Sequence, residues 1–143
     1  MKNTFFYNKL LNFLIKKGKK NNAKSILNAF AIKIRKVYRG PLSALFTELF
    51  SKLSTSVETK RIKMRRNKFV VPFLIKPNRR TYLAIKWFVI SAKKNTRKIP
   101  MEDKLIGEIV STLKKNAKSY SIELKKQNES QAVFNKSNLH FRW

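Results

Sequence analysis

The stretch from Val57 to Lys94 constrains the fold more than any other part of the chain, because it combines strand, turn and helix signals. Cations crowd residues 61–68, where no acid occurs, and residues 69–75 form an apolar run rich in Val and Phe, which favours a strand. Pro72 has no backbone N–H to donate, so the second strand belongs to a two-stranded ribbon or a sheet edge. A lone hairpin is marginally stable in water. We therefore predict a basic β-ribbon that rests on helices or on a partner and has a shape that fits a nucleic-acid groove.

Apolar residues at helical spacing predict helices on both sides of this ribbon. The strongest stripe runs from Leu42 to Leu53 with a single acid, Glu48, so this helix is expected in the core. The last predicted helix is the most polar and must meet solvent or a partner along its length. The predicted helices cover residues 5–15, 23–38, 42–53, 78–94, 100–113 and 117–137.

Residues with special backbone preferences mark the helix ends. Gly18 suits the end of the first helix or a positive φ, and Gly40 suits a C′ position. Pro41 suits the first turn of the third helix, and Asn78 is the predicted N-cap of the fourth. In the second helix the predicted apolar stripe ends at Val37.

The charge balance points to a polyanionic partner. The 143 residues include 34 Lys and Arg but only 7 Asp and Glu, which gives a formal net charge of +27 and a pI near 10.8. On a small folded protein that charge repels itself unless a polyanion neutralises it, so folding and anion binding are expected to be linked. Nucleic acid is the first candidate and an anionic membrane surface is the second.

Reactive groups are scarce, so we predict no enzyme, no cofactor and no metal site. Cysteine is absent, which excludes disulfides, cysteine-ligated zinc, iron–sulfur clusters and thiol nucleophiles. The one histidine, His140, lies near the end of the sequence, and phosphate-cradling glycine motifs are missing. Adjacent carboxylates at Glu102 and Asp103 do not face each other on a helix. A two-metal nuclease site that adds Glu108 is disfavoured, because the helix dipole and the apolar stripe already explain these positions.

Folded RNA fits the distribution of cations better than DNA or a membrane does. The cations fall at a turn, a ribbon, a helix start and the C-terminal segment, which suits recognition of RNA by shape and phosphate. No apolar run approaches the ~20 residues that span a bilayer. The alternative of a membrane-surface-binding basic amphipathic protein needs cationic and apolar faces on one helix, and the strongest apolar stripe carries few cations.

Each cationic locus also has a plainer interpretation. Lysines around Gly18 suit a solvated helix C-terminus, and the aromatic residues of the C-terminal segment could fold onto the core instead of stacking on bases. Arg79 and Arg80 would oppose the dipole of their helix unless phosphates lie there. The candidates for RNA contact are Lys16, Lys17, Lys19, Lys20, Lys60, Arg61, Lys63, Arg65, Arg66, Lys76, Arg79, Arg80, Lys125, Arg142 and Trp143.

Several ordered blocks of sequence carry a resemblance to a known family. They are Asn8-Lys9, Gly18-Lys19-Lys20, Pro41-Leu42, Val57-Glu58, Val71-Pro72, Pro77-Asn78-Arg79-Arg80, Lys86-Trp87, Met101-Glu102, Asn135 and His140-Phe141-Arg142-Trp143. Each block is weak alone, but their order and spacing are specific. From about Asn8 to Trp143 the chain resembles small-subunit ribosomal protein seven of the bacterial and organellar type.

The resemblance implies a mainly α fold, a six-helix bundle with a protruding two-stranded antiparallel β-ribbon at about residues 57–75, in one domain over residues 1–143. It also implies binding to small-subunit ribosomal RNA, nucleation of head-domain assembly, and a position near the exit-site transfer RNA. Neighbouring head and platform proteins are the implied protein partners. Carried to matching positions, the implied RNA contacts are Lys19, Lys20, Lys60, Arg61, Arg79, Arg80, Arg142 and Trp143.

Two departures from the family pattern are visible. Arg65-Arg66-Asn67 replaces the glycines common at the ribbon tip, so Asn67 or a wider loop is expected to supply the positive φ. The sequence also starts where bacterial members already have a basic arm, whose contacts must be lost or taken over. Heavy use of Lys, Asn, Phe and Ile suggests an A/T-rich genome. We therefore expect a ribosome of the mitochondrial matrix, with a plastid or bacterial cytoplasm as the alternative.

Overall fold

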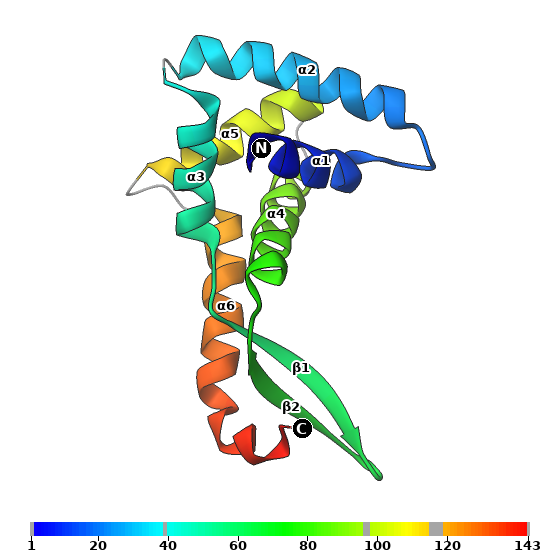
Figure 1. The fold of residues 1–143 in the computed structure, drawn as a ribbon, viewed down its shortest axis with the longest axis vertical. Helices are drawn as coiled ribbons and strands as arrows, with labels where there is room; N and C mark the ends of the chain where they lie inside the picture. The colour runs from blue at the N-terminus through cyan, green and yellow to red at the C-terminus, as the bar shows by residue number, and fades with distance from the viewer. Residues whose placement is uncertain (1, 39, 96–97, 115–118, 143) are drawn as a thin grey trace.

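The computed structural model describes residues 2–38, 40–95, 98–114 and 119–142, with side chains from residue 6 onward. Six α-helices, a short 3₁₀ helix and one two-stranded β-ribbon make up the fold within these residues (Figure 1). The mainly α fold with a two-stranded antiparallel ribbon is therefore as predicted. The elements in chain order are α1 (Lys2–Leu14), α2 (Lys20–Val37), α3 (Leu42–Leu53), β1 (Val57–Met64), β2 (Asn67–Leu74), α4 (Pro77–Lys94), α5 (Met101–Leu113), α6 (Tyr120–Phe134) and η1 (Lys136–Phe141).

Helix α4 lies at the centre of the bundle, where it contacts α1, α3, α5 and α6. Buried positions occur on several of its faces, and Ile85 and Phe88 are almost completely shielded from solvent. Leu49 and Leu53 of α3 and Leu105 of α5 complete the best-buried part of the core. The apolar stripe of α3 is thus core, in agreement with its sequence.

The ribbon extends from the bundle beside α6, and its tip lies at one end of the long axis of the molecule (Figure 1). Helix α6 packs along β1 and η1 packs against β2, so the ribbon rests on helices as expected. Pairing runs from Val57 with Leu74 to Met64 with Asn67. Pro72 is accommodated because each strand of a two-stranded ribbon has a free edge.

The prediction for the ribbon tip was wrong. Asn67 belongs to β2 and pairs with Met64, and no wider loop forms. The turn has only Arg65 and Arg66 between the strands, and Arg65 takes the positive φ of +52°. A two-residue hairpin loop needs φ > 0 within those two residues, so the left-handed position falls on a residue with a Cβ.

Several helix ends also differ from the prediction. The N-cap of α4 is Lys76 rather than Asn78, because Pro77 occupies the first helical position, where its missing N–H is harmless. Tyr38 is the C-cap of α2, so Gly40 lies beyond the C′ position. A Cβ on Gly40 would come within 2.7 Å of the Tyr38 ring, which explains the glycine by close approach. Pro41 precedes α3 as its N-cap.

Two further details concern α2 and the C-terminal helix. Val37 is 62% exposed, and the buried stripe of α2 is Ala23, Leu27, Phe30 and Ile34. The last helix ends at Phe134 instead of residue 137, and η1 follows. Gly18 does have the predicted positive φ, +74°, next to Lys17 at +50°.

Candidate nucleic-acid interface

The acids of the described residues are mostly engaged within the fold. Asp103 and Glu102 accept from Lys33 at 2.7 and 3.4 Å, which joins α5 to α2. Oε1 of Glu108 accepts from the hydroxyls of Ser119 and Ser121 at 2.6 and 2.7 Å, which ties the start of α6 to α5. These carboxylates therefore have structural partners, and the described residues contain no cluster of three or more metal-ligating side chains.

The outer face of the ribbon carries cations that form no salt bridge with the described residues. In an antiparallel pair, residues directly opposite each other project from the same face. Arg61 and Lys63 share one face, and Lys63 pairs directly with Lys68. All three side chains are exposed. Like charges directly opposite are unfavourable, so this face is suited to an anion that bridges the two strands.

Lys68 was missing from the sequence-based candidates, although the register would have identified it. Counting back from the turn at Arg65 and Arg66 places Lys68 opposite Lys63. These two arginines are exposed and extend the basic face to the end of the ribbon. We call Arg61, Lys63, Arg65, Arg66 and Lys68 the ribbon cations.

The inner face of the ribbon receives the C-terminal segment. Phe141 of η1 stacks on Phe69 with ring centroids 4.5 Å apart. Nε of Arg142 donates to the carbonyl of Pro72 at 2.7 Å. Lys60 lies on this face, with Nζ 5.3 Å from the centroid of the Phe73 ring. The segment therefore folds onto the ribbon, a placement that neither of the two sequence interpretations named; Trp143 lies outside the described residues.

The start of α4 combines a paired and an unpaired arginine. Arg79 binds the Glu58 carboxylate of β1 through Nε at 3.0 Å and Nη2 at 2.6 Å. The hydrogen bond from Arg79 lowers the pKa of Glu58, and the positive charges of Arg79, Lys60 and Lys86 add to the effect. From the sequence, only phosphate was expected as the anion at this helix start, but Glu58 also supplies one.

Lys76 and Arg80 remain exposed beside that pair. No described residue accepts a hydrogen bond from the Arg80 guanidinium. Its charge lies at the positive end of the α4 dipole, which is unfavourable without an anion. Of the two arginines, Arg80 is therefore the better placed for phosphate.

Some lysines bind the carbonyl ends of helices. Nζ of Lys125 donates to the carbonyl of Lys52 near the end of α3 at 2.8 Å. Nζ of Lys52 in turn donates to the carbonyl of Leu113 at the end of α5, also at 2.8 Å. Cations at these positions satisfy orphan carbonyls and oppose the helix dipole favourably. Lys125, a predicted RNA contact, is thus already bound within the fold.

The turn between α1 and α2 forms a separate basic locus. Lys16, Lys17, Lys19 and Lys20 are all exposed there. Figure 1 shows that this turn and the ribbon tip lie in different regions of the molecule, so the predicted residues do not form one patch. The arrangement is a set of separated cationic loci, as expected for a large folded polyanion rather than a small ligand.

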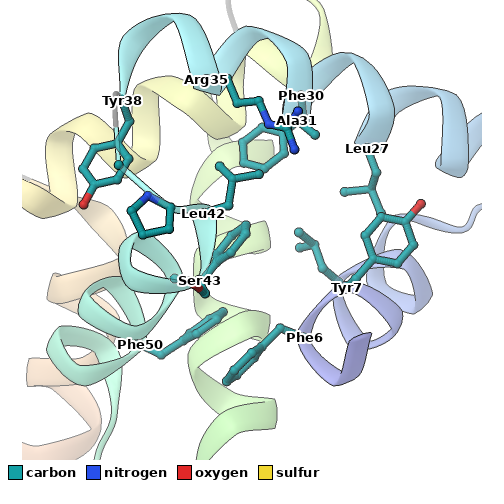
Figure 2. Close-up of a pocket in the computed structure, with 14 residues that line it drawn as sticks. Phe6, Tyr7, Leu27, Phe30, Ala31, Arg35, Tyr38, Leu42, Ser43 and Phe50 are labelled. Carbon is teal, nitrogen blue, oxygen red and sulfur yellow. The ribbon is translucent and has the colours of Figure 1, made fainter. Parts of the chain in front are cut away.

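An apolar groove lies between α1, α2 and α3 (Figure 2). Its volume is about 640 Å³, and its lining includes Phe6, Tyr7, Phe30 and Phe50, with Arg35 as a single cation. It offers aromatic surface and little charge, so it is not part of the cationic loci.

None of the helices in the described part of the chain has the length and apolar character needed to cross a bilayer. The His140 ring packs against Phe141, with Nδ1 2.8 Å from the carbonyl oxygen of Ser137.

Comparison with known proteins gives a consistent match over nearly the whole chain. The family model described as ribosomal protein S7p/S5e matches residues 2–136. The small ribosomal subunit protein uS7 of Dinoroseobacter shibae is 32% identical over 136 residues, covering 94% of this chain and 85% of that protein. The uS7 proteins of Metamycoplasma arthritidis and Syntrophomonas wolfei are each 32% identical over 142 residues, covering 99% of this chain and 88% of theirs.

Proposed function

The chain belongs to the ribosomal protein S7p/S5e family, and on that premise we propose that it binds small-subunit ribosomal RNA directly and nucleates assembly of the head domain near the exit-site transfer RNA. The family is one of structural proteins, so the chain is a ribosomal protein of the small subunit and not an enzyme. The observation that carries the proposal is the ribbon, because the ribbon cations form no salt bridge with any described carboxylate.

The ribbon cations suit binding to RNA phosphates. They lie toward the tip of a narrow two-stranded element, and this tip points away from the helices (Figure 1). Each phosphate contact releases condensed counterions, so affinity should fall linearly with salt on logarithmic axes. For roughly 6–10 contacts, a loss on the order of 10³-fold is expected between 50 and 200 mM salt.

Protein partners are supported by exposed apolar side chains at the end of α6 and at the base of the ribbon. Phe134 and Val133, at the end of α6, are 87% and 69% exposed, and Leu74 at the base of the ribbon is 75% exposed. Large exposed apolar side chains on an otherwise polar helix are typical of protein contacts. We propose that a platform protein covers the end of α6 and that head proteins neighbour the bundle.

The cellular location is proposed from composition and family together. A ribosomal protein of the small subunit acts in the ribosome, and the three relatives described above are bacterial. The mitochondrial matrix remains our prediction from the A/T-rich composition, with plastid and bacterial cytoplasm as alternatives. Mapping the gene to organellar or chromosomal DNA tests it directly.

The direct test is a filter-binding titration of the full chain with small-subunit ribosomal RNA across a salt series. Co-sedimentation with phosphatidylserine vesicles runs in parallel. We expect tight binding to RNA with a steep salt dependence. Failure to bind this RNA, together with sedimentation on vesicles, would replace the proposal with the membrane-surface alternative.

A further inference from the structure

A second, smaller hollow of about 370 Å³ lies where α1, the α1–α2 turn, α2, α4 and α5 meet. Its polar lining consists of Lys16, Lys17, Lys19, Asn22 and Lys93. We call this hollow the lysine pocket. The other lining residues are Leu14, Ala23, Ile26 and Met101. No acid occurs among the described residues that line it. Cations from two segments far apart in the sequence therefore converge on one apolar-walled space.

The turn geometry brings the lysines of the α1–α2 segment to this hollow. Lys17 and Gly18 take consecutive positive φ values of +50° and +74°, and the Lys19 N–H donates to the Lys16 carbonyl at 3.0 Å. The chain reverses tightly, so that Lys16, Lys17 and Lys19 line the same space. The exposed lysines of the turn thus line one hollow together.

Lys93 is the residue that sequence reasoning did not include. Its Nζ lies 3.3 Å from the carbonyl oxygen of Phe13. An ammonium has three donors, and this bond uses one of them. Burial, and then the positive charge of Lys16, lower the pKa of Lys93. A cation held near other cations and partly stripped of water is unfavourable in the free protein, and an anion would remove that penalty.

We propose that the lysine pocket binds one phosphate group of the RNA backbone, held between Lys93 on α4 and the lysines of the α1–α2 turn. This inference rests on the proposed function and adds a defined site to it. The ammonium groups supply the charge, and the Asn22 amide supplies a neutral donor. The apolar wall of Leu14, Ala23, Ile26 and Met101 carries no competing charge, and the exposed lysines opposite it remain accessible to a phosphate.

Lysine footprinting of the full chain tests the site position by position. An amine-acylating reagent is applied to the free protein, to the protein with small-subunit ribosomal RNA, and to the protein with inorganic phosphate. We expect RNA to reduce acylation of Lys93 and Lys16 severalfold, and phosphate alone to do so at much higher concentration. Lys93 that stays fully reactive while ribbon Lys63 and Lys68 are protected would overturn the pocket and leave the proposed function intact. Protection by phosphate but not by RNA would overturn the assignment to RNA.

The matched substitutions are Lys93→Gln and Lys86→Gln, because Lys86 is an exposed lysine of the same helix outside the pocket. Lys93→Gln should reduce the salt slope of RNA binding by about 1. The same change removes an unfavourable charge but also the bond to the Phe13 carbonyl at the end of α1, so the stability of the free protein should change little. Lys86→Gln should change the slope less. Equal slopes for the two variants, or a Lys93→Gln variant that is less stable with unchanged RNA affinity, would show a structural role and overturn the proposal.

Discussion

The lysines of the helical body and those of the ribbon differ in what they contact. In the body, Nζ of Lys52 donates to the Leu113 carbonyl at 2.8 Å and Nζ of Lys104 donates to the Asn95 carbonyl at 2.7 Å. In the ribbon, Lys63 and Lys68 face each other, and the described residues provide no anion for either. The bonds of Lys52 and Lys104 to helix-end carbonyls stabilise the fold, whereas the repulsion between Lys63 and Lys68 destabilises it until a phosphate binds.

This difference shows why net charge alone overstates the RNA-binding surface. A formal charge of +27 counts every cation equally. A lysine at a helix C-terminus is fixed by orphan carbonyls, and removing it should weaken folding more than binding. A cation without a protein partner should show the opposite response. The comparison therefore predicts two separable classes of variant.

The largest expected effect concerns the body alone. Leu49 is fully buried in α3, so Leu49→Ala should lower the free energy of unfolding by roughly 2–5 kcal/mol through loss of apolar burial and a residual cavity. Urea denaturation measures the change, and Ile32→Ala, at a position that is 63% exposed, is the control. The salt slope of RNA binding should stay at its wild-type value. A wild-type urea midpoint would show that α3 is not core.

The next effect concerns the ribbon alone. The double variant Lys63→Gln/Lys68→Gln should reduce the salt slope by about 1.4–1.8, as expected for two lost phosphate contacts. Its urea midpoint should equal or exceed that of wild type, because a like-charge pair has been removed. An unchanged slope would mean that phosphate does not bridge the two strands.

At the start of α4, Arg79 and Arg80 allow a cation bound within the fold and an exposed cation to be compared within one helical turn. Arg80→Ala should reduce the salt slope by about 1, since its guanidinium has no anion among the described residues. Arg79→Ala should change the slope less, because Glu58 already binds this arginine at 2.6 Å. Filter binding across salt separates them. Equal slopes for the two variants would show that RNA competes successfully with Glu58 for Arg79.

A Lys125 variant tests whether this predicted RNA contact instead stabilises the helical body. Its Nζ donates to the Lys52 carbonyl at 2.8 Å, so Lys125→Met should cost about 1 kcal/mol of stability through the lost hydrogen bond. The salt slope should match that of wild type. A lowered slope with an unchanged urea midpoint would place Lys125 among the RNA contacts after all.

The sequence predicted what local patterns determine and missed what depends on long-range packing. Periodicity located the six α-helices and the ribbon, and Gly18 marked its turn correctly. The bond between Glu58 and Arg79, and the approach of Lys93 to the α1–α2 turn, join segments distant in sequence. The spacing of these residues along the sequence does not predict either contact. The positive φ at Arg65 was missed for a different reason, since the loop length, and not the residue preference, decided which position became left-handed.

The smallest effect is a pH dependence that links the ribbon to the body. Because Arg79 lowers the pKa of Glu58 in the folded state, the ion pair stabilises the fold above the ordinary pKa of a glutamate. That stabilisation is lost as the pH falls through the depressed pKa. Urea midpoints of wild type should therefore exceed those of Glu58→Gln at neutral pH and converge with them in acid. Arg79→Gln should lose the same component, since the hydrogen bond that lowers the pKa is gone. Parallel curves for wild type and Glu58→Gln would show that this pair does not stabilise the fold, and the base of the ribbon would then depend on α6 and η1 for its position.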